Sequence, residues 1–227
     1  MTRPLGSRHS ALQKRLAETL MIDLYTWNTP NGRKVSILLE ELNVPYTAHA
    51  IDIATGAQMA PAFLAISPNN KIPAIRDQET GVTLMESGAI LIYLAEKHGQ
   101  FLPPEQRIEI YEWLMWQMAG FGPMLGQAHH FLKYNRGASD YAEERYGAEA
   151  RRLYGVLDRR LEGRDYIVND YSIADMACWP WVSRYEWQDI DLRDFPNVRR
   201  WYQAIAARPA VQRGYHLPDH VNEIPQG

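Results

Sequence analysis

The sequence predicts an α/β domain followed by an all-helical domain, and three observations lead to this fold class. After Met21, a strand-like run, a helical segment and a second strand-like run follow within about 30 residues, as in a βαβ unit. A hairpin pattern then runs from Pro73 to Ser87. Beyond Pro103-Pro104 the strand-like alternation disappears, and only helical spacing remains.

The α/β part begins with the βαβ unit. We expect strands at residues 22–27 and 46–53, joined by a helix at residues 31–42 with a right-handed connection. Thr29 can cap this helix, and Pro30 suits its first position, where a missing N–H costs nothing. A short helix and the hairpin then complete a four-stranded mixed sheet, at residues 58–64 and 74–85.

The second part contains helices only. We expect them at residues 105–134, 141–161, 172 onward and 197–207. Gly122-Pro123 should interrupt the first helix, and Ser172 with Asp175 forms a capping-box-like start for the third. The last helix should end before Pro209, with the chain beyond Gly214 loosely held. The expected parts are an extension (1–20), an α/β domain (21–101), a helical domain (105–214) and a tail (215–227).

Composition excludes several classes of protein. Of 227 residues, 46% are apolar and 22% are charged, with a net charge of -3, so nothing indicates a nucleic-acid partner. No apolar run approaches the roughly 18 residues that a membrane span needs. The single cysteine, Cys178, excludes an internal disulfide and a CxxC motif, and a reducing cytoplasm is the expected location.

The first twenty residues differ from the rest. Residues 1–20 carry four Lys or Arg and one Glu, without the apolar core of a secretory signal. We expect a disordered extension, with Met21 opening the folded part. A transit peptide or a short amphipathic helix is the alternative.

Residues 67–87 predict a binding pocket. Glu86 offers an anion for an ammonium group, and Ser87 is a suitable N-cap for a helix whose free backbone N–H groups attract a carboxylate. Lys71 adds a cation for a second carboxylate, and we expect the Ile72-Pro73 bond beside it to be cis. A capped helix with a solvated Glu and Lys is the structural alternative.

The segments SPNNKIPAI and ESGAILIYLAEK in this region resemble the glutathione-binding half of cytosolic glutathione transferases. Within that family the chain is most similar, from Met21 to Gln212, to bacterial nu-class disulfide-bond oxidoreductases, which are related to a yeast nitrogen-regulator prion protein. The resemblance implies a thioredoxin-like N-terminal domain, an all-helical C-terminal domain, a homodimer and glutathione as co-substrate. We further predict that the Ile72 backbone pairs with the central residue of the ligand, like an added strand.

The glutathione thiolate needs a stabilising group. The stretch after the first strand lacks the Ser or Cys that many family members use there, so the helix start remains, assisted by the Thr29 hydroxyl and the Asn31 amide. The nu-class resemblance implies the same pair, from a T-P-N motif. The alternative is Thr29 as a plain cap and Asn31 as a surface residue.

Other candidates carry less signal. The resemblance implies that Gln58 and Arg145 contact glutathione; alone, Arg145 would be a solvated helix residue. His129 and His130 are adjacent on a helix and do not face one site, so no metal centre is expected. Cys178 lies in an apolar helix and is expected to be an inert core thiol.

These residues predict a glutathione-dependent disulfide-bond oxidoreductase, in which bound glutathione thiolate is the nucleophile. One alternative is conjugation of glutathione to an apolar electrophile held by Trp27, Phe121 and His129. Another is a non-catalytic binding protein on the same fold, but the retained Glu86 and Lys71 argue against it.

Overall fold

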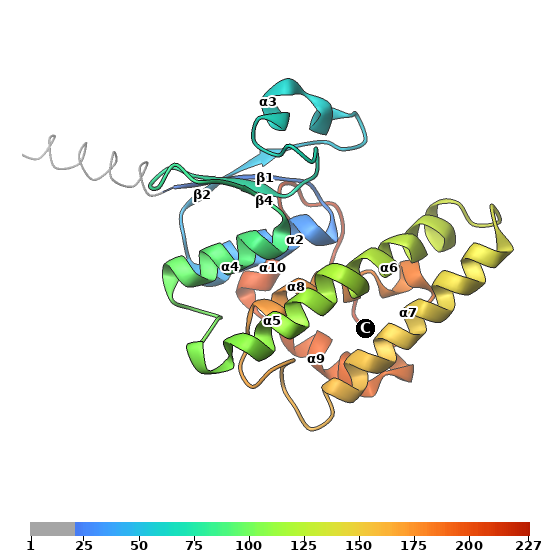
Figure 1. Cartoon of the computed structure of the whole chain (residues 1–227). Coiled ribbons are helices and arrows are strands. Elements are labelled where there is room, and N and C mark those ends of the chain that lie inside the picture. Colours follow the sequence, from blue (N-terminus) through green and yellow to red (C-terminus); the bar gives the residue numbers. More distant parts are fainter. Residues whose placement is uncertain (1–20) are drawn as a thin grey trace, which may run out of the picture.

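The computed structural model describes residues 21–227, and the expectations for residues 1–20 lie outside the described part (Figure 1). The first half contains a four-stranded mixed sheet of order β2-β1-β3-β4, as expected. Its strands are β1 (Ile22–Thr26), β2 (Tyr46–Ala50), β3 (Ala74–Asp77) and β4 (Thr83–Met85). β1 pairs with β2 in parallel, whereas β3 pairs antiparallel with both β1 and β4.

Helices cover both faces of this sheet. α2 (Pro30–Leu42) and α4 (Ser87–His98) lie on one side, and α3 (Pro61–Leu64), preceded by the 3-10 turn η1 (Ala57–Met59), lies on the other (Figure 1). β1 alternates between buried and half-buried positions, because its apolar side chains point toward α2 and α4. The expected thioredoxin-like arrangement is therefore present.

The second half is helical. The 3-10 turn η2 (Pro104–Gln106) leads into α5 (Arg107–Trp116), and α6 (Gly122–Ala128) and α7 (Asp140–Arg160) follow. The interruption expected at Gly122-Pro123 is a π-helical segment, η3 (Gln117–Phe121), placed just before the proline that lacks an N–H. A second π-helical segment, η4 (His129–Tyr134), extends α6.

The remaining elements close the helical half. They are α8 (Ile173–Val182), the 3-10 turns η5 (Tyr185–Gln188) and η6 (Leu192–Asp194), α9 (Pro196–Ala206) and α10 (Pro209–Tyr215). Within residues 21–227, no helix is both long and apolar enough to cross a membrane.

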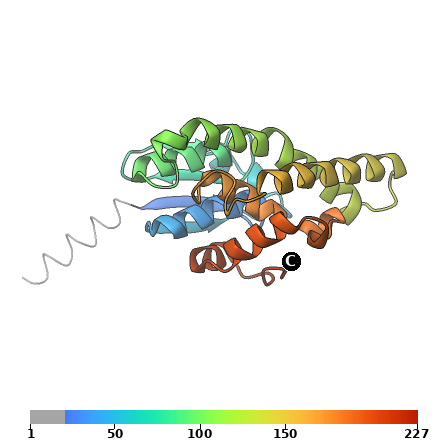
Figure 2. The same ribbon diagram turned by 90° about the horizontal axis from the view of Figure 1, so that it is seen from below.

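The C-terminal region differs from the prediction. Pro209 begins α10 instead of following the last helix, because proline fits the first turn of a helix. α10 packs on α2 so closely that a Cβ at Gly214 would lie 2.7 Å from the Ile37 Cα atom (Figure 2). The Tyr202 hydroxyl donates to the Pro225 carbonyl at 2.7 Å, so the chain after Gly214 is attached, and the expectation that it is loosely held is wrong.

Asp175 organises the start of α8. The predicted capping box is confirmed, with Ser172 as the N-cap. The fully buried Asp175 carboxylate accepts from the backbone N–H groups of Ile167 (2.9 Å) and Ser172 (3.0 Å) and from Trp201 Nε1 (2.8 Å). Burial raises the pKa of Asp175 to about 6, against these hydrogen bonds, which favour the ionised form. One side chain thus joins a loop, α8 and α9.

We predict that Asp175→Ala lowers the free energy of unfolding by about 3 kcal/mol or more, because it leaves several buried donors without an acceptor. Urea unfolding at neutral pH measures this loss. Asp191→Ala is the matched control, since Asp191 caps the turn η6 by accepting from the backbone N–H of the exposed Arg193, and its removal leaves no buried donor unpaired. Equal losses in the two variants would contradict the role of Asp175.

Candidate functional site

A cavity of about 150 Å³ lies where α2, α4 and the loop before β3 meet. It is lined by five of the residues singled out in the sequence, Asn31, Lys71, Ile72, Glu86 and Ser87. The predicted cis bond at Ile72-Pro73 is present. The Ser67 hydroxyl donates to the Lys71 carbonyl at 2.8 Å and holds the loop that carries these residues.

The start of α4 differs in detail from the prediction. The helix begins at Ser87, and its N-cap is Glu86, which makes no side-chain capping bond; the prediction that Ser87 caps the helix is therefore wrong. Glu86 has a φ of 71°, an uncommon conformation for a residue other than glycine. This backbone places an exposed carboxylate next to the free N–H groups at the helix start.

Ser87 has a different partner, which the sequence analysis missed. The fully buried Lys34 of α2 donates from Nζ to Gln117 Oε1 at 2.6 Å and to Ser87 Oγ at 3.3 Å. Burial lowers the pKa of Lys34 to about 7, while the nearby Glu86 carboxylate opposes this shift. Lys34 therefore joins α2, α4 and η3 directly behind the cavity.

Thr29 and Asn31 lie at the start of α2. Thr29 caps this helix as predicted, with its Oγ1 accepting from the Gly32 N–H at 3.1 Å. Asn31 Oδ1 accepts from Trp181 Nε1 at 3.1 Å, which leaves the Asn31 amide N–H₂ available to donate toward the cavity. A Cβ at Gly32 would lie 2.4 Å from the Trp27 carbonyl oxygen, so only glycine fits under this loop.

A second cavity, of about 490 Å³, is lined in part by residues of the same loop. Trp27 and Asn28 contribute to it, and Asn31, three residues after Asn28, lines the first cavity, whereas Thr29 lines neither. Its other walls come from the end of α8, from η5 and from the C-terminal tail, with Arg184, Trp187 and Val221 among them. One segment of the chain, the loop before α2 and the start of this helix, thus contributes to two cavities, a smaller polar one and a larger, more apolar one.

The expected electrophile pocket of Trp27, Phe121 and His129 is wrong. Trp27 lines the second cavity, but Phe121 is fully buried, with its ring centroid 4.8 Å from that of Trp116. His129 is also buried; it stacks on Trp181 and accepts from Gln188 Nε2 at 2.9 Å. Burial lowers the pKa of His129 to about 3, so it is a neutral core residue.

Two residues that the resemblance implied do not line either cavity. Arg145 is exposed on α7, and Gln58 lies in η1, where its Oε1 atom is buried without a hydrogen-bond partner in the described part of the chain. Cys178 is fully buried in α8, and burial raises the pKa of its thiol well above the usual range.

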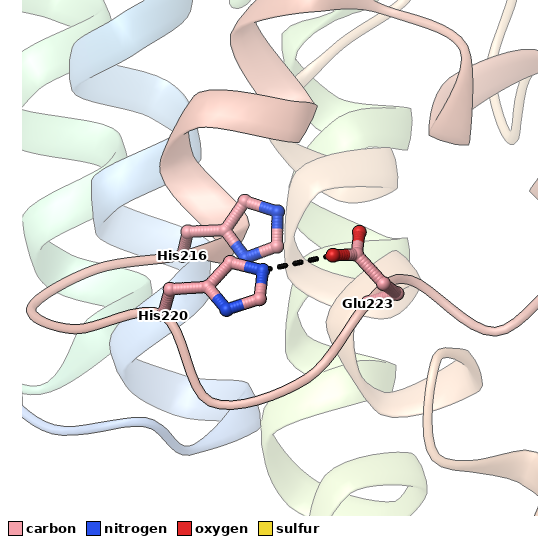
Figure 3. A group of neighbouring side chains, drawn as sticks. All are labelled: His216, His220 and Glu223. Atoms are coloured by element: carbon pink, nitrogen blue, oxygen red, sulfur yellow. Dashed lines mark hydrogen bonds and ion pairs between the residues drawn. The ribbon is translucent and has the colours of Figure 1, made fainter.

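One cluster of His and Glu side chains was not singled out in the sequence. His216, His220 and Glu223 have potential ligand atoms within 4.8 Å of one another (Figure 3). The two rings stack with centroids 4.2 Å apart and an interplanar angle of 29°, and His220 contacts Glu223 at 3.0 Å. Because the lone pair of an imidazole nitrogen lies in the ring plane, two nearly parallel rings do not point at one ion. The cluster in this arrangement connects parts of the tail.

Sequence reasoning missed three groups of this site: Lys34, Arg184 and the tail at residues 221–225. For Lys34 a signal existed, because it precedes Leu38 by four residues and so extends the apolar stripe of α2. A lysine at such a position is buried and needs a partner. Arg184 and the tail carried no comparable signal.

Both halves of the chain match models of one protein family. The family model of the glutathione S-transferase N-terminal domain matches residues 24–104, and that of the C-terminal domain matches residues 117–209. The chain is 50% identical to the disulfide-bond oxidoreductase YfcG of Escherichia coli, over 84% of this chain and 93% of that protein.

Solved structures agree. A glutathione transferase from Burkholderia graminis, with two glutathione molecules per subunit, is 44% identical with a TM-score of 0.83, and the match covers 95% of each chain. One from Pseudomonas putida, with one glutathione disulfide per subunit, is 42% identical with a TM-score of 0.83, covering 95% of this chain and 100% of that chain. From both domains, the overall fold and these relatives, the chain belongs to the glutathione S-transferase family.

Proposed function

We propose that this protein is a glutathione-dependent disulfide-bond oxidoreductase, in which bound glutathione supplies the attacking thiolate. The observation that carries this proposal is that the loop before α2 and the start of this helix contribute to two cavities, with Trp27 and Asn28 lining the second and Asn31 lining the first. A glutathione in the first cavity can present its sulfur near Thr29 and Asn31, with the other half of a disulfide in the second. The similarity to YfcG and to the Pseudomonas putida protein with bound glutathione disulfide supports this arrangement.

The first cavity suits the polar ends of glutathione. Glu86 would pair with the ammonium of its glutamyl residue, and the N–H groups at the start of α4 would bind the adjacent carboxylate. Ser87 is kept in place by Lys34 from behind. Lys71 would hold the glycyl carboxylate, and the Ile72 backbone would pair with the central residue of the ligand as an added strand does.

The start of α2 would stabilise the thiolate. Its free backbone N–H groups and the positive end of the helix dipole favour an anion, and the Asn31 amide can donate to the sulfur. The Thr29 hydroxyl accepts from Gly32 and retains its own O–H to donate. Gln58 and Arg145 do not line this cavity. Their proposed contacts with glutathione therefore require groups that a single chain does not bring together.

The reaction would proceed by two exchanges. The bound glutathione thiolate attacks one sulfur of a disulfide, its S–S bond breaks, and the other sulfur leaves as a thiolate that takes up a proton. A second glutathione thiolate then attacks the mixed disulfide, which releases the second thiol and forms glutathione disulfide. No protein thiol takes part, since Cys178 is buried with a raised pKa.

We further propose that the chain is of the nu class, forms a homodimer and acts in the cytoplasm. The similarity to YfcG supports the class. A reducing compartment suits a protein whose single cysteine is a free, buried thiol.

We predict that Glu86→Gln weakens glutathione binding by about 1 to 3 kcal/mol, because the ammonium of the ligand loses its charged partner. Isothermal titration calorimetry with S-methylglutathione, which cannot react, measures this change. Glu105→Gln is the control, since Glu105 is also exposed and lies on the turn before α5. Unchanged affinity in Glu86→Gln would remove Glu86 from the site.

We predict that the double variant Thr29→Ala/Asn31→Ala raises the pKa of bound glutathione by about one to two units, because donors to the thiolate are removed. Its rate of bis-hydroxyethyl disulfide reduction at neutral pH should fall correspondingly, by about tenfold to a hundredfold. The pH dependence of the rate gives the pKa, and circular dichroism checks that α2 is retained. When Ser replaces Ala at position 29 of the double variant, giving Thr29→Ser/Asn31→Ala, the hydroxyl is kept and part of the lost rate should return.

Cys178→Ala is the complementary variant, and it should keep most of the glutathione-driven activity. If this variant is folded but inactive, glutathione is not the nucleophile and the proposed mechanism fails. If the wild-type protein reduces no small disulfide with glutathione, the proposed function itself fails.

A further inference from the structure

The second cavity is lined by an arginine, Arg184, whose positive charge is not paired with an acidic side chain of the described residues. Trp27, Trp187, Val221 and Pro225 give the cavity an apolar wall, and its volume of about 490 Å³ suits a small ligand. Arg184 is the basic residue that lines it. An arginine in a mostly apolar wall would favour a ligand that carries an anionic group.

Arg184 is buried and only partly hydrogen-bonded. Its side chain is 7% exposed, and its Nε atom is buried without a partner within residues 21–227. Nη1 makes a long contact of 3.5 Å with Asn222 Oδ1, and the guanidinium lies 4.3 Å from the Trp187 ring centroid. The contact with Trp187 involves the guanidinium group as a ring partner, whereas the edge of a guanidinium is the part that binds a carboxylate through two parallel hydrogen bonds.

No acidic side chain in the described part of the chain forms an ion pair with Arg184. Glu186 also borders the cavity, but it is exposed and its carboxylate contacts the Tyr185 hydroxyl at 3.5 Å. Glu186 therefore lies at the rim, in solvent, and leaves the Arg184 charge unpaired.

A second buried arginine increases the excess of positive charge. Arg33 is 1% exposed, donates from Nε to the Tyr215 carbonyl at 2.9 Å, and has a buried Nη1 without a partner in residues 21–227. The pKa of Arg33 is lowered to about 10, first by burial and then by the Arg184 charge. Two like charges buried near each other are unfavourable, and a bound anion reduces that cost.

We propose that the second cavity binds a substrate that carries a carboxylate, and that Arg184 holds this carboxylate. The ligand class is a small disulfide with an acidic group, its sulfur directed to the α2 start and its apolar part against Trp27 and Trp187. What happens to this ligand depends on the proposed function, whereas its binding does not. Arg184 is thus a specificity-determining residue, which separates acidic disulfides from neutral ones of the same size.

The test compares two disulfides of similar size, dithiodiglycolate with two carboxylates and bis-hydroxyethyl disulfide with two hydroxyls. For Arg184→Met we expect kcat/KM for dithiodiglycolate to fall about tenfold or more, the loss of one charged hydrogen-bonded pair, and that for the neutral disulfide to change less than about twofold. Arg193→Met is the control, because Arg193 is exposed and pairs with Asp191 outside the cavity. Arg193→Met should alter neither value.

Two outcomes would overturn the proposal. A similar fall with both disulfides would mean that Arg184 only maintains the structure, and no fall with either would mean that it does not contact the substrate. Arg184→Lys provides a further check, since it keeps the charge without the planar edge and should give an intermediate value for dithiodiglycolate alone.

A binding measurement separates this inference from the proposed function. Dithiodiglycolate is titrated calorimetrically into the protein while S-methylglutathione, which cannot exchange, fills the first cavity. We expect Arg184→Met to weaken this binding about tenfold. If that loss occurs but the wild type reduces neither disulfide, the anion site stands and the proposed function fails. If the wild type reduces both and Arg184→Met changes neither binding nor kcat/KM, the function stands and the anion site is wrong.

Discussion

The site depends on the burial of α2 between the sheet and the helical half. Positions Gly32 to Leu39 of this helix are all buried, including Arg33, Lys34 and Ser36, so each polar group must find a partner in a neighbouring element. Arg33 donates to the carbonyl of Tyr215 in α10, Lys34 to Gln117 in η3, and Ser36 to the carbonyl of Gly214. These contacts fix the helix whose first turn would stabilise the thiolate.

The same constraint explains why the cavities are built from both halves. Trp181 of α8 holds the oxygen of Asn31, and Lys34 holds Ser87 against Gln117. A helix enclosed in this way cannot shift without breaking hydrogen bonds in both halves, so the reacting groups stay in place before a ligand arrives. The cost is the burial of three basic side chains, Arg33, Lys34 and Arg184, and burial lowers the pKa of Lys34 to about 7.

Local sequence was sufficient to predict those features that depend only on neighbouring residues. The βαβ unit, the hairpin, the Thr29 cap and the Ser172–Asp175 capping box were all predicted, because periodicity and capping act within a few residues. Lys71, Ile72, Glu86 and Ser87 were correctly placed on one cavity, since a short hairpin keeps them near one another. α10 was missed because a proline such as Pro209 can either end a helix or occupy the first turn of one, and sequence alone does not separate these two cases.

The sequence by itself therefore determined the fold class, most of the elements and the residues of the first cavity, and the tertiary structure decided the rest. A helical stripe shows that Phe121 and His129 face inward, but not whether they meet a ligand or the aromatic rings that in fact cover them. Nor does the sequence show that the tail and η5 reach the start of α2 and leave Arg184 beside a cavity without an acidic partner. Such contacts join residues far apart in the chain, and only the packing of whole elements brings them together.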